Sequence, residues 1–162
     1  MRAADEGEYR DYVSARLAGF RRTAYLVCRD WHLADDVVAV VLGKLYRQWS
    51  RRREIANLDA YVGGMLARAA IDERRRPWRR ETAGDPPEGQ AGADESVLDR
   101  MTLDGYLAKL GPRRRAVLVL RFYCDLSVEE TAEALGISAG TVKSQAARGL
   151  ETLRALARQG NQ

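Results

Sequence analysis

Apolar residues recur at three- and four-residue steps along most of this chain, the spacing that gathers them on one face of an α-helix. One such stripe predicts a helix through residues 9–24, a second covers residues 34–49, and a third begins at Asn57 and stops before Pro77. The opening residues 1–10 are expected to be frayed. No segment alternates apolar and polar residues as a half-buried strand does, so the pattern predicts an all-α protein.

The helical pattern is interrupted by the sequence ETAGDPPEGQAGADE, which is rich in glycine, proline and acidic residues and has no apolar periodicity. Such a composition is typical of a linker or loop. We therefore expect two small helical domains, residues 1–80 and residues 97–162, joined by a flexible acidic linker over residues 81–96.

The second block is also predicted to be helical. One helix should run from Val97 to Leu110, where Gly111-Pro112 stops it, and Pro112 is well placed to begin the next helix, which reaches about Tyr123.

Residues 125–156 carry the most specific local signal. Ser127 followed by Glu130 forms a capping box that should start a helix. Gly136 can take the left-handed conformation that ends it, and Ser138 can cap a second helix. Leu135, Ile137, Val142 and Leu150 would form the small core between the two helices.

This arrangement is typical of a DNA-binding helix-turn-helix, whose second helix enters the major groove. The alternative is an ordinary helical hairpin with a solvated face. The candidate residues for contact with DNA are Ser138, Ala139, Gly140, Thr141, Lys143, Ser144 and Arg148.

The charge distribution agrees with a nucleic-acid partner. Residues 1–80 carry 17 Lys and Arg against 11 Asp and Glu, and residues 101–162 carry 9 against 6. Residues 81–100 between them carry one Arg and six acids. Two basic blocks suit a polyanion, because phosphate contacts release counterions. The alternative is that these charges serve only to keep the protein soluble.

The sequence argues against an enzyme and against a metal or cofactor site. His32 is the only histidine, and Cys28 and Cys124 lack CxxC spacing, so buried free thiols are expected, with a disulfide or metal pair as the alternative. No phosphate-binding glycine loop or nucleophile motif is present. No apolar run has the length of a signal peptide or membrane span, so we expect a cytoplasmic protein that does not insert into a membrane.

The stretch LAKLGPRRRAVLVLRFYCDLSVEETAEALGISAGTVKSQAARGLETLR resembles region 4 of the extracytoplasmic-function sigma factors, group 4 of the sigma-70 family. The pieces FRRTAYLVCRDWHLADDVV, LYRQW and NLDAYVGGMLARAAIDERRR resemble region 2 of the same family. The likeness covers nearly the whole chain and looks closest to an actinobacterial subgroup.

This resemblance implies a sigma factor that directs core RNA polymerase to specific promoters. Region 4 would bind the −35 element of double-stranded promoter DNA, and region 2 would bind polymerase and the melted −10 strand. Two DNA-binding domains on one tether raise each other's effective concentration. The acidic linker would thread through polymerase, or it is merely a soluble spacer.

The resemblance also assigns residues in the first domain. Strand opening needs cations for the displaced backbone and a pocket for an extruded base; the alternative is that the arginines form only a solvated helix end. The −10 candidates are Arg51, Arg52, Arg53, Asn57, Tyr61, Arg68, Asp72 and Arg75. The positions that match the polymerase-binding helix are Asp35, Asp36, Leu45 and Tyr46.

This chain departs from the family at several of these positions. Ala39-Val40 stand where the family usually carries Gln-Glu, Gly63-Gly64 replace a pair that is often basic, and Arg68 replaces Asn. These departures support a second hypothesis, a stand-alone helix-turn-helix regulator or a divergent sigma factor that acts as a decoy. Family members are often held inactive by an anti-sigma factor, so such a partner is also possible here.

Overall fold

The computed structural model describes residues 2–75 and 103–160 of the chain. In those two ranges the backbone forms helices and their connections, with no β-strand, which confirms the all-α prediction. The proposed linker, residues 81–96, lies outside the described residues. The elements are α1 (Ala3–Cys28), α2 (Trp31–Arg47), η1 (Trp49–Glu54), α3 (Leu58–Arg75), α6 (Leu103–Leu107), α7 (Pro112–Leu118), η2 (Val119–Tyr123), α8 (Val128–Leu135) and α9 (Ala139–Gly160).

The N-terminal half is a bundle of α1, α2 and α3 with the short 3-10 helix η1 between the last two. Local signals fix its boundaries. The side chain of Asp30 accepts the backbone N–H groups of His32 and Leu33 and so caps α2, and Asn57 Oδ1 accepts the N–H of Ala60 at 3.1 Å to cap α3 as predicted. The expectation that residues 1–10 are frayed is wrong, because α1 already begins at Ala3.

The C-terminal half begins, among the described residues, with the short helix α6, which ends at Leu107 rather than at the predicted Leu110. Pro112 starts α7, as expected. The predicted continuation to Tyr123 exists, but its last five residues form the π-helix η2. The helices α8 and α9 follow.

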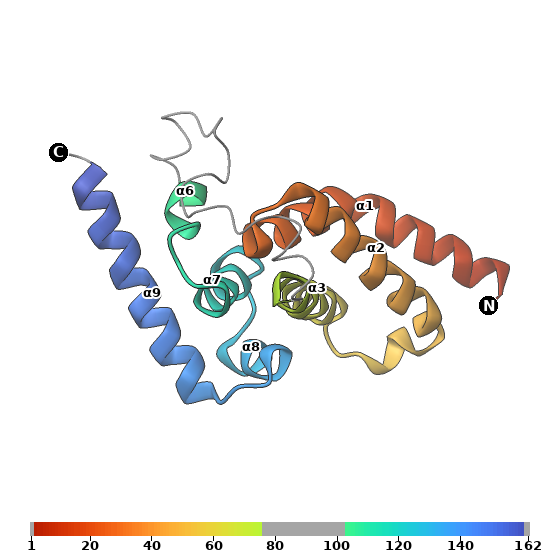
Figure 1. The fold of residues 1–162 in the computed structure, drawn as a ribbon. Coiled ribbons are helices and arrows are strands. Elements are labelled where there is room, and N and C mark those ends of the chain that lie inside the picture. The colour runs from red at the N-terminus through yellow and green to blue at the C-terminus, as the bar shows by residue number, and fades with distance from the viewer. Residues whose placement is uncertain (1, 76–102, 161–162) are drawn as a thin grey trace.

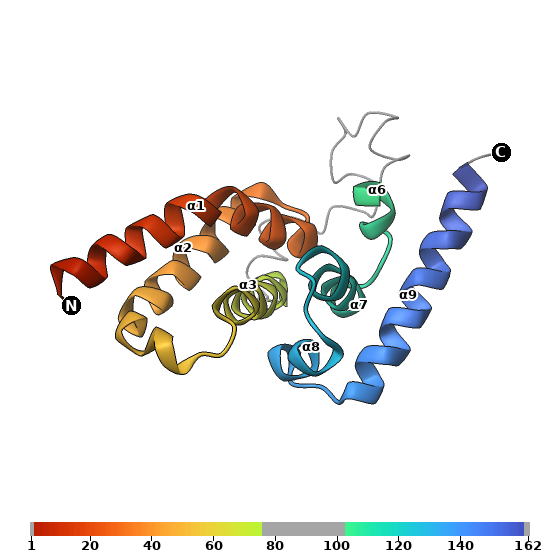
Figure 2. The same cartoon turned by 180° about the vertical axis from the view of Figure 1, so that it is seen from behind.

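The two halves share one core, which the sequence did not predict. Buried residues of the first half, among them Phe20, Val41 and Leu66, belong to the same continuous apolar cluster as Leu118 and Leu120 of the second. Helix α3 packs on α8, and α1 packs on α7 and η2. Both views show α3 between the rest of the N-terminal bundle and the C-terminal helices, with α9 along the outer edge (Figures 1 and 2).

Candidate nucleic-acid interface

The connection between α8 and α9 has the predicted helix-turn-helix geometry. Ser127 Oγ accepts the N–H of Glu130 at 3.0 Å, and a Glu130 carboxylate oxygen accepts the N–H of Ser127 at 2.9 Å, which completes the capping box. Gly136 ends α8 with φ 66°, a conformation that side chains with a Cβ disfavour. Ser138 Oγ then accepts the N–H of Thr141 at 3.0 Å and so caps α9.

A small core under the turn sets which side of α9 faces solvent. Val142 is fully buried against Val117 and Ala132, and the partly buried Leu135 and Ile137 pack on them. This confirms three of the four residues predicted for this core. The fourth, Leu150, packs instead on the larger core that the two halves share.

The opposite side of α9 carries the residues predicted to contact DNA. Ala139 is half-buried, and the others are all exposed: Ser138, Gly140, Thr141, Lys143, Ser144 and Arg148. They supply two cations and three hydroxyl groups, and two of these hydroxyls, on Ser138 and Thr141, lie 2.8 Å apart. An exposed helix face with this chemistry can hydrogen bond to phosphates and to base edges in a major groove.

The arginines predicted for −10 binding differ in their surroundings. Arg51 and Arg53 are exposed on η1. The side chain of Arg52 is only 11% exposed, because its guanidinium forms ion pairs with Asp5 and Glu8 of α1. In this structure the ion pairs of Arg52 hold η1 against α1.

The residues of α3 predicted for −10 binding lie along one face of the helix. Tyr61, Arg68 and Asp72 are exposed, and the Tyr61 hydroxyl donates to Gln48 Oε1 at 3.1 Å. Asn57 caps the helix, and its amide nitrogen donates to a carboxylate oxygen of Glu130, 73 residues away in the capping box of α8, at 3.3 Å. Arg75 lies in the last turn of α3, and its side chain is not among those described.

Arg68 and Asp72 border a hollow of about 160 Å³ between α3 and the helix-turn-helix. Two polar residues there were missed by the sequence reasoning, Arg113 and Gln145. Gln145 directly follows Ser144, but it accepts a hydrogen bond from Arg114 at 2.8 Å and so faces inward. Only the packing of the halves shows that these side chains meet, so no sequence signal could have found them.

The predicted polymerase-binding residues of α2 divide into exposed and buried ones. Asp35 and Asp36 are exposed, as is Tyr46, whose hydroxyl donates to Glu6 at 2.9 Å. Leu45 is fully buried in the core. It therefore stabilises the bundle and offers no atoms to a partner in this structure.

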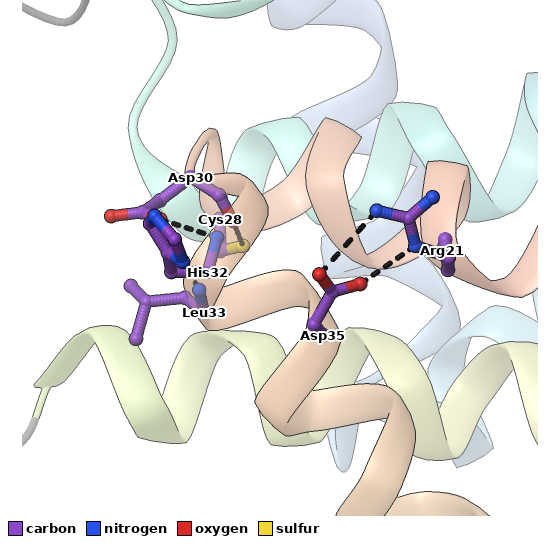
Figure 3. A network of polar contacts seen from close by, with 6 residues as sticks. All are labelled: Arg21, Cys28, Asp30, His32, Leu33 and Asp35. Atoms are coloured by element: carbon purple, nitrogen blue, oxygen red, sulfur yellow. Dashed lines mark hydrogen bonds and ion pairs between the residues drawn. The ribbon is translucent and has the colours of Figure 1, made fainter.

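Near the start of α2, Asp35 forms an ion pair with Arg21 of α1, with Nε and Oδ1 2.6 Å apart (Figure 3). The hydrogen bond from Arg21 holds the pKa of Asp35 below its ordinary value. Both groups are exposed, and surface ion pairs of this kind contribute little to stability. A binding partner can therefore replace the contact between Arg21 and Asp35 with contacts of its own at a small cost in free energy. The same figure shows Asp30 capping α2 and the Cys28 thiol pointing to the Asp30 carbonyl.

Both cysteines are free thiols, as predicted, although Cys124 is only half-buried while Cys28 is fully buried. Among the described residues, no cluster of His, Cys, Asp and Glu is arranged to hold a metal ion. None of the helices in the described ranges is long and apolar enough to cross a membrane.

Comparison with known proteins agrees with this geometry. Residues 13–80 match the family model for sigma-70 region 2, and residues 100–153 match the model for sigma-70 region 4. The chain is 36% identical over 153 residues to the RNA polymerase sigma-E factor of Streptomyces coelicolor, covering 91% of this chain and 84% of that protein. It is 30% identical over 162 residues to the ECF RNA polymerase sigma factor SigL of Mycobacterium tuberculosis, covering 94% and 90%.

A solved structure of the sigma factor RpoE from Bartonella quintana, in complex with the anti-sigma factor NepR, has a similar fold. Its TM-score is 0.72 at 22% identity, covering 93% of this chain and 97% of that one. Both family models match the two halves in the expected order, and the relatives match along nearly the whole chain. This chain therefore belongs to the sigma-70 family, as an alternative RNA polymerase sigma factor of the extracytoplasmic-function group.

Proposed function

We propose that this sigma factor reads the −35 element through α9 and the −10 element through η1 and α3, while α2 contacts core RNA polymerase. The observation that carries the proposal is the exposed face of α9, where Thr141, Lys143, Ser144 and Arg148 project beside a capped turn. The core beneath α9 holds this face outward, as major-groove docking requires.

The −10 surface in this proposal consists of exposed cations on η1 and α3, the aromatic side chain of Tyr61 near the start of α3, and the carboxylate of Asp72 further along that helix. Its members are Arg51, Arg53, Tyr61, Arg68 and Asp72. Arginines can follow a displaced phosphate backbone, and an exposed tyrosine ring gives an unstacked base a surface on which to stack. Arg52 is left out because its side chain is only 11% exposed and pairs with Asp5 and Glu8. Asn57 is left out because it caps α3 and contacts Glu130, and Arg75 because its side chain is not among those described.

The polymerase surface is the exposed side of α2, with Asp35, Asp36 and Tyr46 as contacts. Ala39 and Val40 lie on the same exposed side, so the family departure at these two positions changes the surface and not the core. We further propose that the protein works in the cytoplasm, binds an anti-sigma factor and catalyses no covalent reaction.

The first test is co-purification with core RNA polymerase followed by run-off transcription on genomic fragments. Specific transcripts that require this chain are the expected result, and they would identify the promoter. Polymerase binding without transcripts would favour the decoy hypothesis. DNA binding without polymerase association would favour a stand-alone regulator.

The residue assignment on α9 has its own test on the promoter fragment. Lys143→Ala and Arg148→Ala should each weaken binding and lower the salt slope by about 1 if the residue contacts a phosphate. If the residue contacts a base, its loss should cost about 1–3 kcal/mol and relax specificity. Arg154→Ala, an exposed arginine further along the same helix, is the matched control. Equal binding by all three variants would refute the assignment.

A further inference from the structure

The N-terminal part of α1 carries four polar residues that face the segment proposed for −10 binding. They recur at steps of three and four residues and therefore share one face of the helix. We call them the α1 anchor residues: Asp5, Glu8, Tyr12 and Arg16. We call residues 49–59, which comprise η1 and the start of α3, the −10 segment. Each anchor residue bonds to a side chain of this segment.

The two acids hold η1 through Arg52. One nitrogen of its guanidinium, Nη2, donates to Asp5 Oδ1 at 3.1 Å and to a carboxylate oxygen of Glu8. The other, Nη1, donates to the carbonyl of Trp49 at 3.0 Å. Because the Arg52 side chain is only 11% exposed, salt screens these ion pairs less than it screens pairs on the open surface.

The anchored position of Arg52 determines where its neighbours point. η1 is a 3-10 helix, in which three residues complete a turn, so successive side chains point about 120° apart. With Arg52 directed at α1, Arg51 and Arg53 are directed away from it, and both are exposed. These are the two cations of η1 that the proposed function assigns to the −10 strand.

A second contact holds the start of α3. The Tyr12 hydroxyl donates to Asp59 Oδ1 at 2.7 Å, and Arg16 Nε donates to the same oxygen at 2.8 Å. The Arg16 guanidinium lies over the Tyr12 ring, 4.2 Å from its centroid, so the two side chains also attract each other. Burial, and then the hydrogen bond to Asp59, raise the pKa of Tyr12, so its hydroxyl keeps the proton that it donates.

Aromatic packing adds a third contact, at the first residue of the segment. The Trp49 ring lies 5.4 Å from the ring of Tyr12 and 5.4 Å from the ring of Tyr9, and it is 2% exposed. Aromatic rings at such distances stabilise one another beyond the area they bury. The −10 segment is thus attached to α1 at its first residue, at Arg52 and at its last residue, Asp59.

We propose that the α1 anchor residues position the −10 segment for the melted strand, and so determine how well this chain discriminates its −10 sequence without contacting DNA themselves. The inference rests on the proposed function, which assigns −10 binding to η1 and α3. A segment held in one arrangement is ready to bind, whereas a loosened segment binds only in the fraction of molecules that keep that arrangement.

The charge of the two acids shapes the test. Carboxylates beside a DNA-binding surface repel phosphates and lower the affinity for every sequence alike. Neutralising Asp5 and Glu8 would therefore raise affinity whether or not they position η1. The first comparison uses changes that leave the charge of the protein unaltered.

This comparison removes one hydroxyl group from each of two tyrosines on α1. Tyr12→Phe loses the hydrogen bond to Asp59 and keeps the ring against Trp49. Tyr9→Phe is the matched control, because its hydroxyl donates to the carbonyl of Leu42 in α2, outside the −10 segment, at 2.8 Å. A difference between the two variants therefore reports the contact with Asp59.

Hydrogen exchange followed by mass spectrometry measures how firmly the segment is held, in the absence of DNA. The amides of residues 50–59 should exchange about fivefold faster in Tyr12→Phe than in Tyr9→Phe, the factor that a typical hydrogen bond contributes to an equilibrium. Equal exchange in the two variants would overturn the proposal.

Discrimination is measured with holoenzyme assembled from core RNA polymerase and each variant. The probes are the non-template −10 strand of the promoter found by run-off transcription and a strand of the same composition in scrambled order. The ratio of the two affinities should fall about fivefold in Tyr12→Phe and keep its wild-type value in Tyr9→Phe. Faster exchange with an unchanged ratio would overturn the claim that α1 serves −10 recognition.

The same measurement separates this inference from the function on which it rests. If wild-type holoenzyme does not distinguish the two strands, the proposed −10 function is refuted, and the inference with it. If wild type distinguishes them and Tyr12→Phe does so equally well, only the inference fails.

A charge exchange tests whether Arg52 acts through α1. Arg52→Glu breaks the ion pair with Glu8 and should lower the ratio at least as much as Tyr12→Phe does. Adding Glu8→Arg restores an ion pair with its charges exchanged and should recover the ratio. Loss of a phosphate contact would instead weaken both strands alike, because phosphates carry no sequence information. An unchanged ratio in Arg52→Glu, or no recovery in the folded double variant, would refute positioning by Arg52.

Discussion

Replacing Arg115 tests how strongly the two regions hold each other. Its side chain is 4% exposed, although guanidinium groups are rarely buried without partners. Besides the Val27 carbonyl at 2.7 Å, it donates to the Leu110 carbonyl at 2.9 Å and, over a longer 3.5 Å, to the Leu107 carbonyl. The carbonyl of Val27 is one of the last in α1 and has no partner within that helix, so a cation there also complements the helix dipole.

The expected loss follows mainly from the two shorter hydrogen bonds, to Val27 and Leu110. Bonds to a charged donor contribute about 1.5–3 kcal/mol each, and their removal leaves two buried carbonyls unsatisfied. Arg115→Met keeps a long apolar stem and removes every donor. We therefore expect the free energy of unfolding to fall by about 3–5 kcal/mol, a large share of the roughly 5–15 kcal/mol of a small protein.

The assay is urea unfolding followed by circular dichroism, with two comparison variants. Arg113→Met removes an exposed arginine from the same helix and should change stability by no more than about 0.5 kcal/mol. Arg115→Lys keeps the charge but cannot reproduce the geometry of the guanidinium, so its loss should be intermediate. If Arg115→Met and Arg113→Met unfold at the same urea concentration, the argument from buried hydrogen bonds is refuted.

Three further predictions concern other elements. Ser127→Ala removes the capping box of α8 and should lower stability by about 1 kcal/mol in the same urea assay; an unchanged midpoint would show that the cap is dispensable. Restoring Gln-Glu at Ala39 and Val40 should tighten binding to core RNA polymerase, measured by titration, with unchanged stability because both positions are exposed; equal dissociation constants would mean that these two positions do not contribute. The hydrogen bond from Arg21 lowers the pKa of Asp35, so the stabilisation from this pair should be fully present above pH 3.8, the ordinary pKa of aspartate. It should disappear as the pH falls through the lower pKa that Asp35 has in the folded protein. Melting curves of wild type and Asp35→Asn should thus differ slightly at neutral pH and converge in strong acid, and a gap that persists in acid would contradict the pairing.

The sequence could predict whatever depends on neighbours along the chain. Helix periodicity and the caps at Asn57, Ser127 and Ser138 are local, and the structure has each of them. The exposed face of α9 followed from the same spacing, since burying Val142 turns the residues around it outward. Leu45 also falls within the apolar stripe predicted over residues 34–49, and its complete burial agrees with that stripe and not with the polymerase contact implied by resemblance.

Roles that depend on distant partners were decided only by the tertiary structure. Arg52 could not be separated from Arg51 and Arg53 by sequence, because its partners lie more than 40 residues away on α1. From sequence, Gly63 and Gly64 are only a departure from the family. The structure shows Leu120 of η2 and Cys124 against Gly63, and Ala134 of α8 against Gly64. A sequence specifies its helices through short-range hydrogen bonds and side-chain periodicity, whereas the docking of region 4 on region 2 follows from how two separately patterned surfaces fit in space.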